Sequence, residues 1–594
     1  MALTKDTVEL AGWEFANIPS FVGGLDTLLA ADQIDESNTP RSSNVVLRQG
    51  RIEIDTGYTT LGSTVVGKPR LVYRFIKANG SAELILITNS TVYKWDSTAA
   101  EWQYISNGTS TTLTADANAT DLTLTVADIT GFADTERIAI VLDTGAQHQT
   151  TVNGTPNGST ITITDAMPSL ATSGNVVLEA VALAGTDARQ VDVVNMAAKD
   201  WMIFTNGVNK VYRYDKTDIQ VLSNLPSSGN TICRSLAVFV NHLVLLYTTE
   251  GGTAYPQRAR WCDTGNPEEW AKGNASYRDL YEDAHPITSA MLLGPYLIVY
   301  KSRSIFRGTH VGSSDLLFSF EQTIPDRGAI SVNAVVGDHS THYVMDRKGI
   351  YAYKGGFAID KKTFDKIHRL LFDTTDGELD PNSAEKGFMV FIEGSRELGF
   401  FYPSIGETSN NKFIRYGLVT KELLQRTLTH NVLGFGENVV AANQTWTSAT
   451  GSWAGQVGKW NRRSATANAP TLLLCQDTAN QVFEYDLLAT DDSGTGIAFS
   501  FETKDFVSPN KDLRFDGFYF LIKGSTVLIE YSKDAGFSWS TLKSITPGVT
   551  YLEVTVFKQI VTRKIRFRFS GTGGGFGLGR MGFKYRDESK PVEE

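Results

Sequence analysis

The sequence repeats one short phrase, in which an apolar residue, a polar turn and an aromatic-rich segment follow one another. Residues 204–215 read FTNGVNKVYRYD, and similar text stands at 86–96, 344–356 and 474–486, with a looser copy at 299–308. The Asn-Gly pair accepts the positive φ of a tight turn, so the phrase predicts a β-hairpin. A hairpin that returns many times along a chain indicates a repeat architecture.

The distances between the aromatic positions of these phrases indicate a period. Tyr212 follows Tyr93 by 119 residues, Phe306 follows Tyr212 by 94, Tyr351 follows Phe306 by 45, and Phe483 follows Tyr351 by 132. If 45 residues form one unit, 94 is about two units and 132 about three, whereas 119 is too long by roughly 75. This period predicts an all-β fold, a β-propeller of about six to eight blades. An irregular pair of β-sandwiches is the alternative.

The excess of roughly 75 residues falls in residues 108–183, which are rich in Thr, poor in aromatic residues and strictly alternating in DLTLTV and STITIT. Alternation with period two is typical of strands with one buried face, so this segment is predicted to be a small inserted β domain. The expected organisation is an N-terminal arm with the first strands (1–62), the propeller start (63–107), the inserted domain (108–183), further blades (184–490) and a C-terminal β-rich, sandwich-like region that closes or extends the propeller (491–594). Two short helices are expected, at 361–373 and 420–428.

Charge and apolar patterning exclude several classes of protein. The chain has 55 basic and 65 acidic residues and a net charge of −10, which argues against an outer surface that grips nucleic acid through its phosphates. The longest apolar run, 236–247, is too short to span a bilayer, and no secretory signal is visible at the start. Cys233, Cys262 and Cys475 are too few and scattered for a disulfide framework or a zinc site, so we expect buried thiols in a soluble, intracellularly made protein.

The stretch SKDAGFSW at 532–539 resembles the Asp-box of sialidases and other propeller-type proteins. Its residues predict a structural hairpin, in which Ser532 and Asp534 bond the turn, Gly536 supplies the special φ and Trp539 packs beneath. A sialidase-like glycosidase would also need an arginine cluster and a Tyr nucleophile with a Glu partner, and no local spacing indicates such a set.

Three other patterns imitate known ligand sites without completing them. They are the acidic turn with Asp373, Asp376, Glu378 and Asp380, the pair His339 and His342, and the glycine-rich stretch 571–580. The first lacks a full calcium ligand ladder, the second lacks a third ligand, and the third does not lie in a βαβ unit. The sequence therefore predicts no metal, no cofactor and no catalytic residue, which favours a binding or structural role.

Residues 19–62 resemble the opening of tail nozzle proteins, also called tail tubular protein B, of short-tailed bacteriophages. The matching positions are Gly23, Gly24, Asp26, Thr27, Asn44, Val45, Gly50, Gly57 and Tyr58. Asp55 stands where the family usually has a basic residue, so a contact of this position with a phosphate or an acidic group is not expected.

A second match to the same family covers residues 258–273. Arg260, Trp261, Asp263, Gly265, Asn266, Pro267 and Trp270 fit its pattern, and Cys262 replaces the usual Ser. Further similar segments follow at 292–312, 346–356 and 485–506, in the family's order. Together they cover most of the chain outside the 108–183 insertion, and the motif residues are expected to be structural.

The resemblance implies a structural virion protein that is not an enzyme. Family members form a homo-oligomeric ring, a hexamer, below the adaptor ring, with tail fibres or spikes attached nearby, and phage DNA passes through the lumen without sequence-specific binding. The expected location is the virion tail, after synthesis in the host cytoplasm. Six copies carry six times −10, or −60, which would repel DNA phosphate in the lumen. The alternatives are a propeller-type tail depolymerase or sialidase-like glycosidase, and a host-surface binding tail protein, for which 108–183 is the natural candidate. We expect this segment instead to be a decoration or docking domain that touches a neighbouring tail protein.

Overall fold

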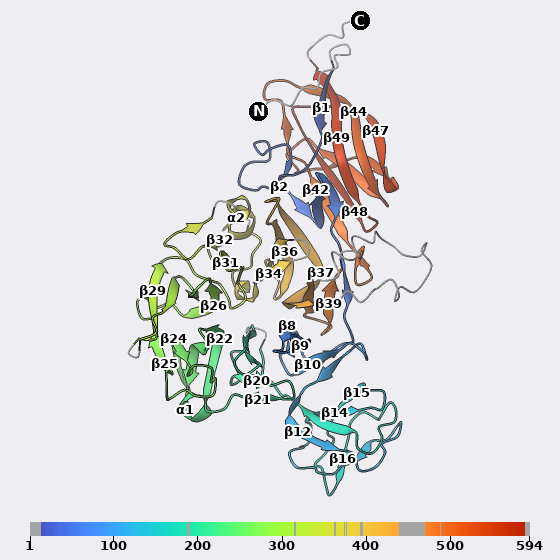
Figure 1. Ribbon diagram of the computed structural model, residues 1–594. Helices are drawn as coiled ribbons and strands as arrows, with labels where there is room; N and C mark the ends of the chain where they lie inside the picture. The colour runs from blue at the N-terminus through green and yellow to red at the C-terminus, as the bar shows by residue number, and fades with distance from the viewer. Residues whose placement is uncertain are drawn as a thin grey trace.

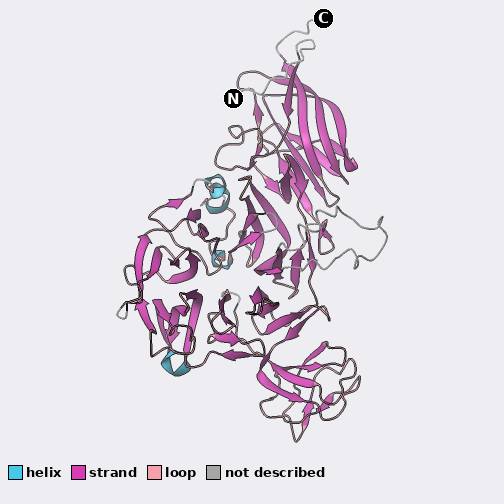
Figure 2. Ribbon diagram, viewed as in Figure 1, coloured by secondary structure: helices cyan, strands magenta, loops and turns pink. Residues whose placement is uncertain are grey.

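The computed structural model describes residues 13–186, 190–313, 316–361, 364–373, 375, 377–392, 396–438, 470–486 and 489–588. Within these ranges the chain is nearly all β, which confirms the all-β part of the predicted fold. Helix occurs there only as α1 (Pro226–Gly229), α2 (Asp365–Phe372) and the short 3-10 turn η1 (Ala384–Lys386) (Figure 2). The strands are short and joined by tight turns, as expected for a chain with 53 glycines and many aromatic residues.

Four antiparallel sheets of four strands follow one another along the middle of the chain, and in each sheet every strand pairs with the next one in sequence. The first contains β18 (Asp192–Met196), β19 (Trp201–Thr205), β20 (Tyr212–Tyr214) and β21 (Ile219–Val221), and the second β22 (Thr231–Phe239), β23 (His242–Glu250), β24 (Thr253–Trp261) and β25 (Ser276–Asp279). The third contains β26 (Ile287–Leu293), β27 (Tyr296–Lys301), β28 (Ile305–His310) and β29 (Phe318–Ile324), and the fourth β30 (Val335–Gly337), β31 (His342–Asp346), β32 (Gly349–Tyr353) and β33 (Ile359–Asp360).

The phrase FTNGVNKVYRYD forms the hairpin between β19 and β20, as predicted. Asn206 Oδ1 accepts a hydrogen bond from the backbone N–H of Asn209 at 2.8 Å, and Gly207 has a φ of 69°. Across the hairpin Phe204 stands opposite Tyr212, with ring centroids 5.3 Å apart. Tyr214 is buried and its hydroxyl donates to Glu83. These tyrosines therefore pack the sheet.

A larger sheet of 13 strands joins segments that are far apart in the chain. Its strands are β7 (Tyr58–Thr60), β8 (Pro69–Ile76), β9 (Ala82–Thr88), β10 (Val92–Asp96), β11 (Glu101–Tyr104), β34 (Phe388–Ile392), β35 (Glu397–Tyr402), β36 (Asn410–Gly417), β37 (Leu423–Asn438), β38 (Thr471–Gln476), β39 (Val482–Tyr485), β40 (Asp491–Asp492) and β41 (Thr495–Gly496). The first half of β37 pairs with β36, and its second half pairs with β38 and runs parallel to β8. Figure 1 shows this sheet and the four smaller ones around a common centre.

The two predicted helices have different outcomes. The first is present as α2, where Ile367 and Leu371 are buried and Phe364, just before the helix, packs on Phe400 with ring centroids 5.4 Å apart. The second prediction, a helix over 420–428, is wrong, because these residues lead into and begin β37. The strand is buried on both faces at its start, and periodicity does not separate such a strand from a buried helix.

One side chain, Gln190, joins segments that lead into three different sheets. Gln190, just before β18, donates from Nε2 to the carbonyls of Lys386 and Gly387, both at 3.1 Å. Its Oε1 accepts from the backbone N–H of Asn333 at 2.9 Å, and Asn333 Nδ2 donates to the carbonyl of Val191. The segments that lead into β18, β30 and β34 therefore meet across the centre and hold three sheets together.

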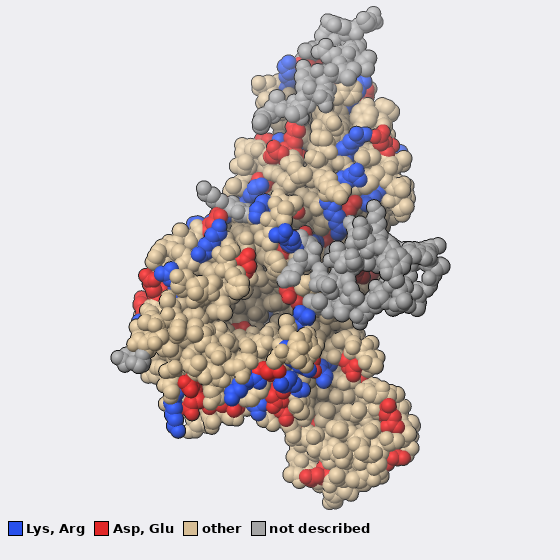
Figure 3. Space-filling model, viewed as in Figure 1, with Lys and Arg blue, Asp and Glu red and all other residues tan. Residues whose placement is uncertain are grey.

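Residues 106–180 form a separate body with its own core. It contains β12 (Ser106–Thr112), β13 (Thr123–Thr125), β14 (Arg137–Val141), β15 (Gln147–Thr151), β16 (Thr160–Thr162) and β17 (Val176–Ala180), in two small sheets. Leu124, Ile138 and Ile161 are fully buried in this core. The segment holds eight acidic residues and one basic residue, so it carries −7 of the chain's −10. On the face shown in Figure 3 it has red patches and no blue.

Both ends of the chain build a two-layer body beyond the ring (Figure 1). One sheet contains β1 (Glu14–Ile18), β5 (Val45–Arg48), β6 (Arg51–Ile54), β44 (Leu513–Gly524), β47 (Gly548–Thr562) and β49 (Gly577–Asp587), and the other β4 (Ser42–Ser43), β42 (Ala498–Glu502), β43 (Phe506–Val507), β45 (Val527–Ser532), β46 (Ser540–Ile545) and β48 (Lys564–Thr572). Buried aromatic residues such as Phe518, Phe567 and Phe583 fill the space between them.

Both ends of the chain contribute strands to more than one sheet. At the start of residues 491–594, β40 and β41 extend the larger sheet beyond β7, and the rest of this region forms the two-layer body. Within the described part of residues 1–62, the first strands β1, β4, β5 and β6 lie in the two sheets of the C-terminal body, and β7 lies in the larger sheet. An open sheet leaves unpaired backbone groups at its edges, and strands from the other end of the chain pair with those groups.

Candidate functional site

The Asp-box residues form the turn between β45 and β46. Gly536, with a φ of 91°, donates its backbone N–H to Ser532 Oγ at 2.8 Å, and Ser532 Oγ donates to Asp534 Oδ1 at 2.7 Å. Asp534 also accepts from the hydroxyl of Ser538 at 2.5 Å and from its backbone N–H at 2.9 Å, and these bonds, with that of Ser532, lower the pKa of Asp534 to about 2. Trp539 packs against the guanidinium of Arg568 at 4.2 Å. The polar side chains of Ser532 and Asp534 therefore stabilise the turn, as predicted.

The 258–273 motif also builds a local turn, at the end of β24. Trp261 is buried and its indole N–H donates to the carbonyl of Asn274 at 2.9 Å, while Asp263 Oδ1 accepts from the backbone N–H of Asn274 at 2.9 Å. Gly265 has a φ of 68°, where a side chain would be strained. Pro267 and Trp270 are buried.

An ion cluster lies beside this turn, on the outer strands of the second sheet. Arg260 Nε and Nη2 donate to the two oxygens of Glu250, both at 2.9 Å. Arg258 makes a two-pronged contact with Asp279 at 2.8 and 2.9 Å, which raises the pKa of Arg258 and lowers that of Asp279. Tyr255 and Tyr277 cover the Arg258 guanidinium at 3.7 and 4.0 Å. Tyr281, 67% exposed, donates its hydroxyl to Asp279.

A cleft of about 640 Å³ opens next to this cluster, between segment 224–229 and segment 268–271, with Glu250 and Arg260 in its wall. Its carboxylates already serve as structural acceptors. Glu268 accepts from the backbone N–H of Ser223, Glu269 from those of Ala271 and Lys272, and Glu250 from arginine. The pair of uncommitted carboxyl groups that glycoside hydrolysis uses is not formed by these residues.

A second cluster of arginines and carboxylates is sealed inside the molecule, where the N-terminal segment meets β36, β37 and β40. Arg415 and Arg426 both bond Asp55, and Arg426 Nη2 lies 2.6 Å from Asp492 Oδ1. Asp55 and Asp492 are 1% and 0% exposed. Burial alone would raise the pKa of Asp55, but the charges of Arg415 and Arg426 hold it well below its usual range. No local spacing in the sequence indicated this network.

The remaining sequence candidates have structural partners. His342 contacts the Tyr300 hydroxyl at 2.8 Å and the Leu292 carbonyl at 2.9 Å, and burial lowers its pKa. Glu378 accepts from Tyr402, Lys412 and Gln425, while Asp376 lies outside the described residues. The described ranges contain no group of three or more His, Cys, Asp or Glu residues that could hold a metal ion.

The three cysteines are free and buried, as expected. Burial raises the pKa of Cys262 to about 12 and raises the pKa values of Cys233 and Cys475 still further. Buried thiols with raised pKa values are unreactive. None of the helices in the described part of the chain is long and apolar enough to cross a membrane.

Four exposed apolar side chains lie along one strand, β47 (Gly548–Thr562). Among the described strands β47 pairs only with β44, so it is the edge of its sheet over 15 residues. Val549, Leu552, Phe557 and Val561 on this strand are 92%, 51%, 78% and 44% exposed. A groove of about 300 Å³ lies on the same sheet, lined by Phe15, Tyr519 and Leu521 among others. Such an edge is a template for pairing with another chain.

No protein-family model and no curated protein sequence matches the chain. Similar solved structures include TmCBM61 in complex with β-1,4-galactotriose, which is 13% identical, covers 22% of this chain and 80% of its own, and has a TM-score of 0.13. Another is exo-β-1,3-galactanase from Phanerochaete chrysosporium with galactose, 10% identical over 82% of this chain and 98% of its own, with a TM-score of 0.21. These scores are too low to bear on the fold or the function of this chain.

Proposed function

We propose that the chain is a non-enzymatic structural subunit of a phage tail nozzle, built on a seven-bladed β-propeller. The seven blades are the four central meanders, the sheet of β8 to β11, the sheet of β34 to β36 with the first half of β37, and the second half of β37 with β38, β39 and β7. Each group has four antiparallel strands, which supports the count. The ordered motifs at 19–62, 258–273, 292–312, 346–356 and 485–506 support the nozzle family.

The observation that carries this proposal is the open edge of β47. Its 15 residues leave backbone N–H and C=O groups unpaired on one side, and four of its apolar side chains are 44–92% exposed. Soluble monomers rarely keep such a long apolar edge, because it pairs with other chains. A subunit that assembles into a closed ring covers this strand with a neighbouring subunit or an attached tail protein.

The cross-ring hydrogen bonds bear on where DNA passes. Gln190 joins the segments before β30 and β34 across the centre of the propeller. A DNA duplex therefore does not fit through the centre of one subunit. In a nozzle the channel is enclosed between subunits, with the adaptor ring above and tail fibres or spikes attached nearby.

The oligomeric state of the purified chain tests the role of β47. Phe557→Glu places a charge on the edge strand, and Phe357→Glu is the matched control, since Phe357 is 66% exposed on another part of the molecule. We expect the native chain and the Phe357→Glu variant to form oligomers in mass photometry, and Phe557→Glu to shift to monomer. If Phe557→Glu assembles as the native chain does, β47 is not the interface.

A second candidate function is glycan binding at the outer edge of the second sheet. The observation that favours it is the rigid platform of Tyr277 and Tyr281, 49% and 67% exposed, beside the Arg258 cluster. Exposed aromatic rings next to fixed hydrogen-bonding groups suit a sugar ring, and the adjacent cleft of about 640 Å³ has the size of a small-ligand site.

Titration of the native chain with a panel of defined oligosaccharides tests this candidate. Tyr277→Ala and Tyr281→Ala should abolish binding, whereas Tyr247→Ala, on β23 of the same sheet, should not. Incubation with the same sugars followed by a reducing-end assay separates binding from hydrolysis, and released sugar would contradict a non-enzymatic protein. Absence of binding at millimolar concentrations would exclude the glycan site.

A further inference from the structure

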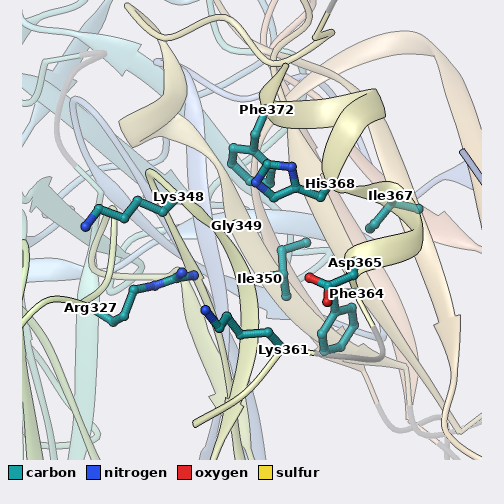
Figure 4. A pocket seen from close by; sticks show the side chains of 10 residues that line it. All are labelled: Arg327, Lys348, Gly349, Ile350, Lys361, Phe364, Asp365, Ile367, His368 and Phe372. Carbon is teal, nitrogen blue, oxygen red and sulfur yellow. The ribbon is translucent and has the colours of Figure 1, made fainter. Parts of the chain in front are cut away.

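A pocket between the β31–β32 hairpin and α2 has a strongly basic lining. Arg327, Lys348, Lys361 and His368 contribute to its wall, and Asp365 is its one carboxylate (Figure 4). The cations come from three segments of the chain, the loop after β29, the β31–β32 turn and the end of β33, and the imidazole comes from α2. No motif in the sequence pointed to this group, because its members are brought together only by the fold.

Arg327 is held in a fixed orientation at this pocket. Its Nη2 donates to Asp346 Oδ1 at 3.0 Å, and its Nε lies 2.5 Å from Asp346 Oδ2. The guanidinium also lies over the ring of Tyr351, 5.1 Å from the centroid. The hydrogen bond to Asp346 uses one of the five N–H donors of Arg327, so other N–H groups of this oriented guanidinium remain for a ligand.

The two lysines differ in their orientation. Lys348 Nζ lies 2.6 Å from Asp326 Oδ1, and Figure 4 shows its ammonium turned away from the other side chains. The ammonium of Lys361 is turned toward the guanidinium of Arg327 in the same view. Two cations that face one another repel, and an anion between them replaces the repulsion with two attractions.

Gly349 leaves the space between these groups open. A Cβ built on Gly349 would lie 3.5 Å from His368 Cδ2 and 3.6 Å from Arg327 Nη2. The missing side chain therefore keeps room between the imidazole and the guanidinium. The pocket has a volume of about 140 Å³, enough for a small oxyanion with some water and below the usual size of a drug-like ligand site.

We propose that this pocket binds a phosphate group. The free N–H groups of Arg327 contact two phosphate oxygens, Lys361 supplies a point charge, and His368 borders the same space. Asp365 accepts a hydrogen bond from the P–OH group of a monoanion. The site is independent of the proposed ring, because all of its residues lie within one chain.

Calorimetric titration of the native chain with inorganic phosphate, at an ionic strength held constant with sodium chloride, tests this site. Loss of one charge-assisted hydrogen bond weakens binding by about tenfold or more. We expect that loss for Lys361→Gln, and a smaller one for His368→Gln. Lys348→Gln removes the same charge from a side chain that points away, so it should bind phosphate within about twofold of the native chain.

A second experiment identifies whether the bound phosphate is a free ion or part of a polymer. A short oligonucleotide with a 5′-phosphate is compared with the same oligonucleotide bearing a 5′-hydroxyl. Binding of the phosphorylated form alone, displaced by inorganic phosphate, assigns the site to a phosphate carried on a polymer, whereas binding of inorganic phosphate alone assigns it to the free ion. The proposal is overturned if the native chain binds no phosphate at 10 mM, or if Lys361→Gln and Lys348→Gln weaken binding equally.

Discussion

Asp55 joins the first part of the chain to strands that lie more than 350 residues later. It sits between Arg415 and Arg426, and Arg426 also pairs with Asp492. The single negative charge of Asp55 is shared by two buried guanidinium groups. A contact of this residue with DNA is excluded by its burial, since it is 1% exposed.

Removing the charge of Asp55 should destabilise the protein strongly. Asp55→Asn leaves Arg415 and Arg426 buried with less negative charge beside them, and breaking a buried ion pair costs about 3–5 kcal/mol. Urea unfolding followed by tryptophan fluorescence should show an earlier transition. Glu553→Gln removes the partner of Arg580 at the surface and should leave the transition unchanged, because exposed pairs contribute little. Equal transitions for both variants would contradict this role of Asp55.

Asp192 predicts a pH dependence of stability at the residue scale. Burial raises the pKa of Asp192 to about 6, although Ser235 Oγ and the Leu236 backbone N–H donate to its carboxylate at 2.7 and 2.8 Å. A carboxyl group whose pKa is higher in the folded state binds its proton more tightly there, so the folded state loses stability as the pH rises from about 4 to 6.

The variant Asp192→Asn isolates that contribution. The melting temperature of Asp192→Asn relative to the native chain should rise between pH 4 and pH 7 and then stay level, since the asparagine does not ionise. Thermal unfolding of both proteins at several pH values gives the difference. If the melting temperatures of the two proteins differ by the same amount at every pH over this range, Asp192 does not titrate between pH 4 and pH 7.

At the scale of elements, the local sequence was enough to predict the hairpins but not the long strand β37. The Asn206–Gly207 turn and the Ser532–Trp539 turn depend on residues within a few positions, so their patterns could be read directly. β37 forms through its partners β36, β38 and β8. Because its first residues are buried on both faces, their apolar pattern in the sequence cannot be told from that of a buried helix. Arg415 and Arg426 carry no local signal, because Asp55 is 360 residues from Arg415.

The inserted domain should be separable from the rest of the fold. It begins with β12 and ends with β17, which pair with one another, and it has its own core. Replacing residues 106–180 with a short Gly-Ser linker should leave the remaining chain folded and its oligomeric state unchanged. Its melting temperature should fall, because Ala139 and Ala180 no longer cover Leu86 and Tyr93. The isolated segment 106–180 should show cooperative unfolding. Loss of folding in the shortened chain would contradict an independent domain.

At the scale of the whole molecule, the negative charge is unevenly placed. Residues 106–180 carry −7 of the net −10, so six copies would carry six times −7, or −42, on the inserted domains out of −60 in total. In the ring that we propose, repulsion of DNA would therefore depend on where the inserted domains lie relative to the channel. Asp/Glu→Lys changes there should slow DNA passage only if they face the channel.

Electron microscopy of the purified chain, alone and mixed with its adaptor ring, tests the central proposal most directly. The account predicts a closed six-fold ring, with β47 covered at a contact between chains and with the channel between subunits, away from the centre of each propeller. A chain that remains monomeric under both conditions and releases sugars from host polysaccharide would contradict it.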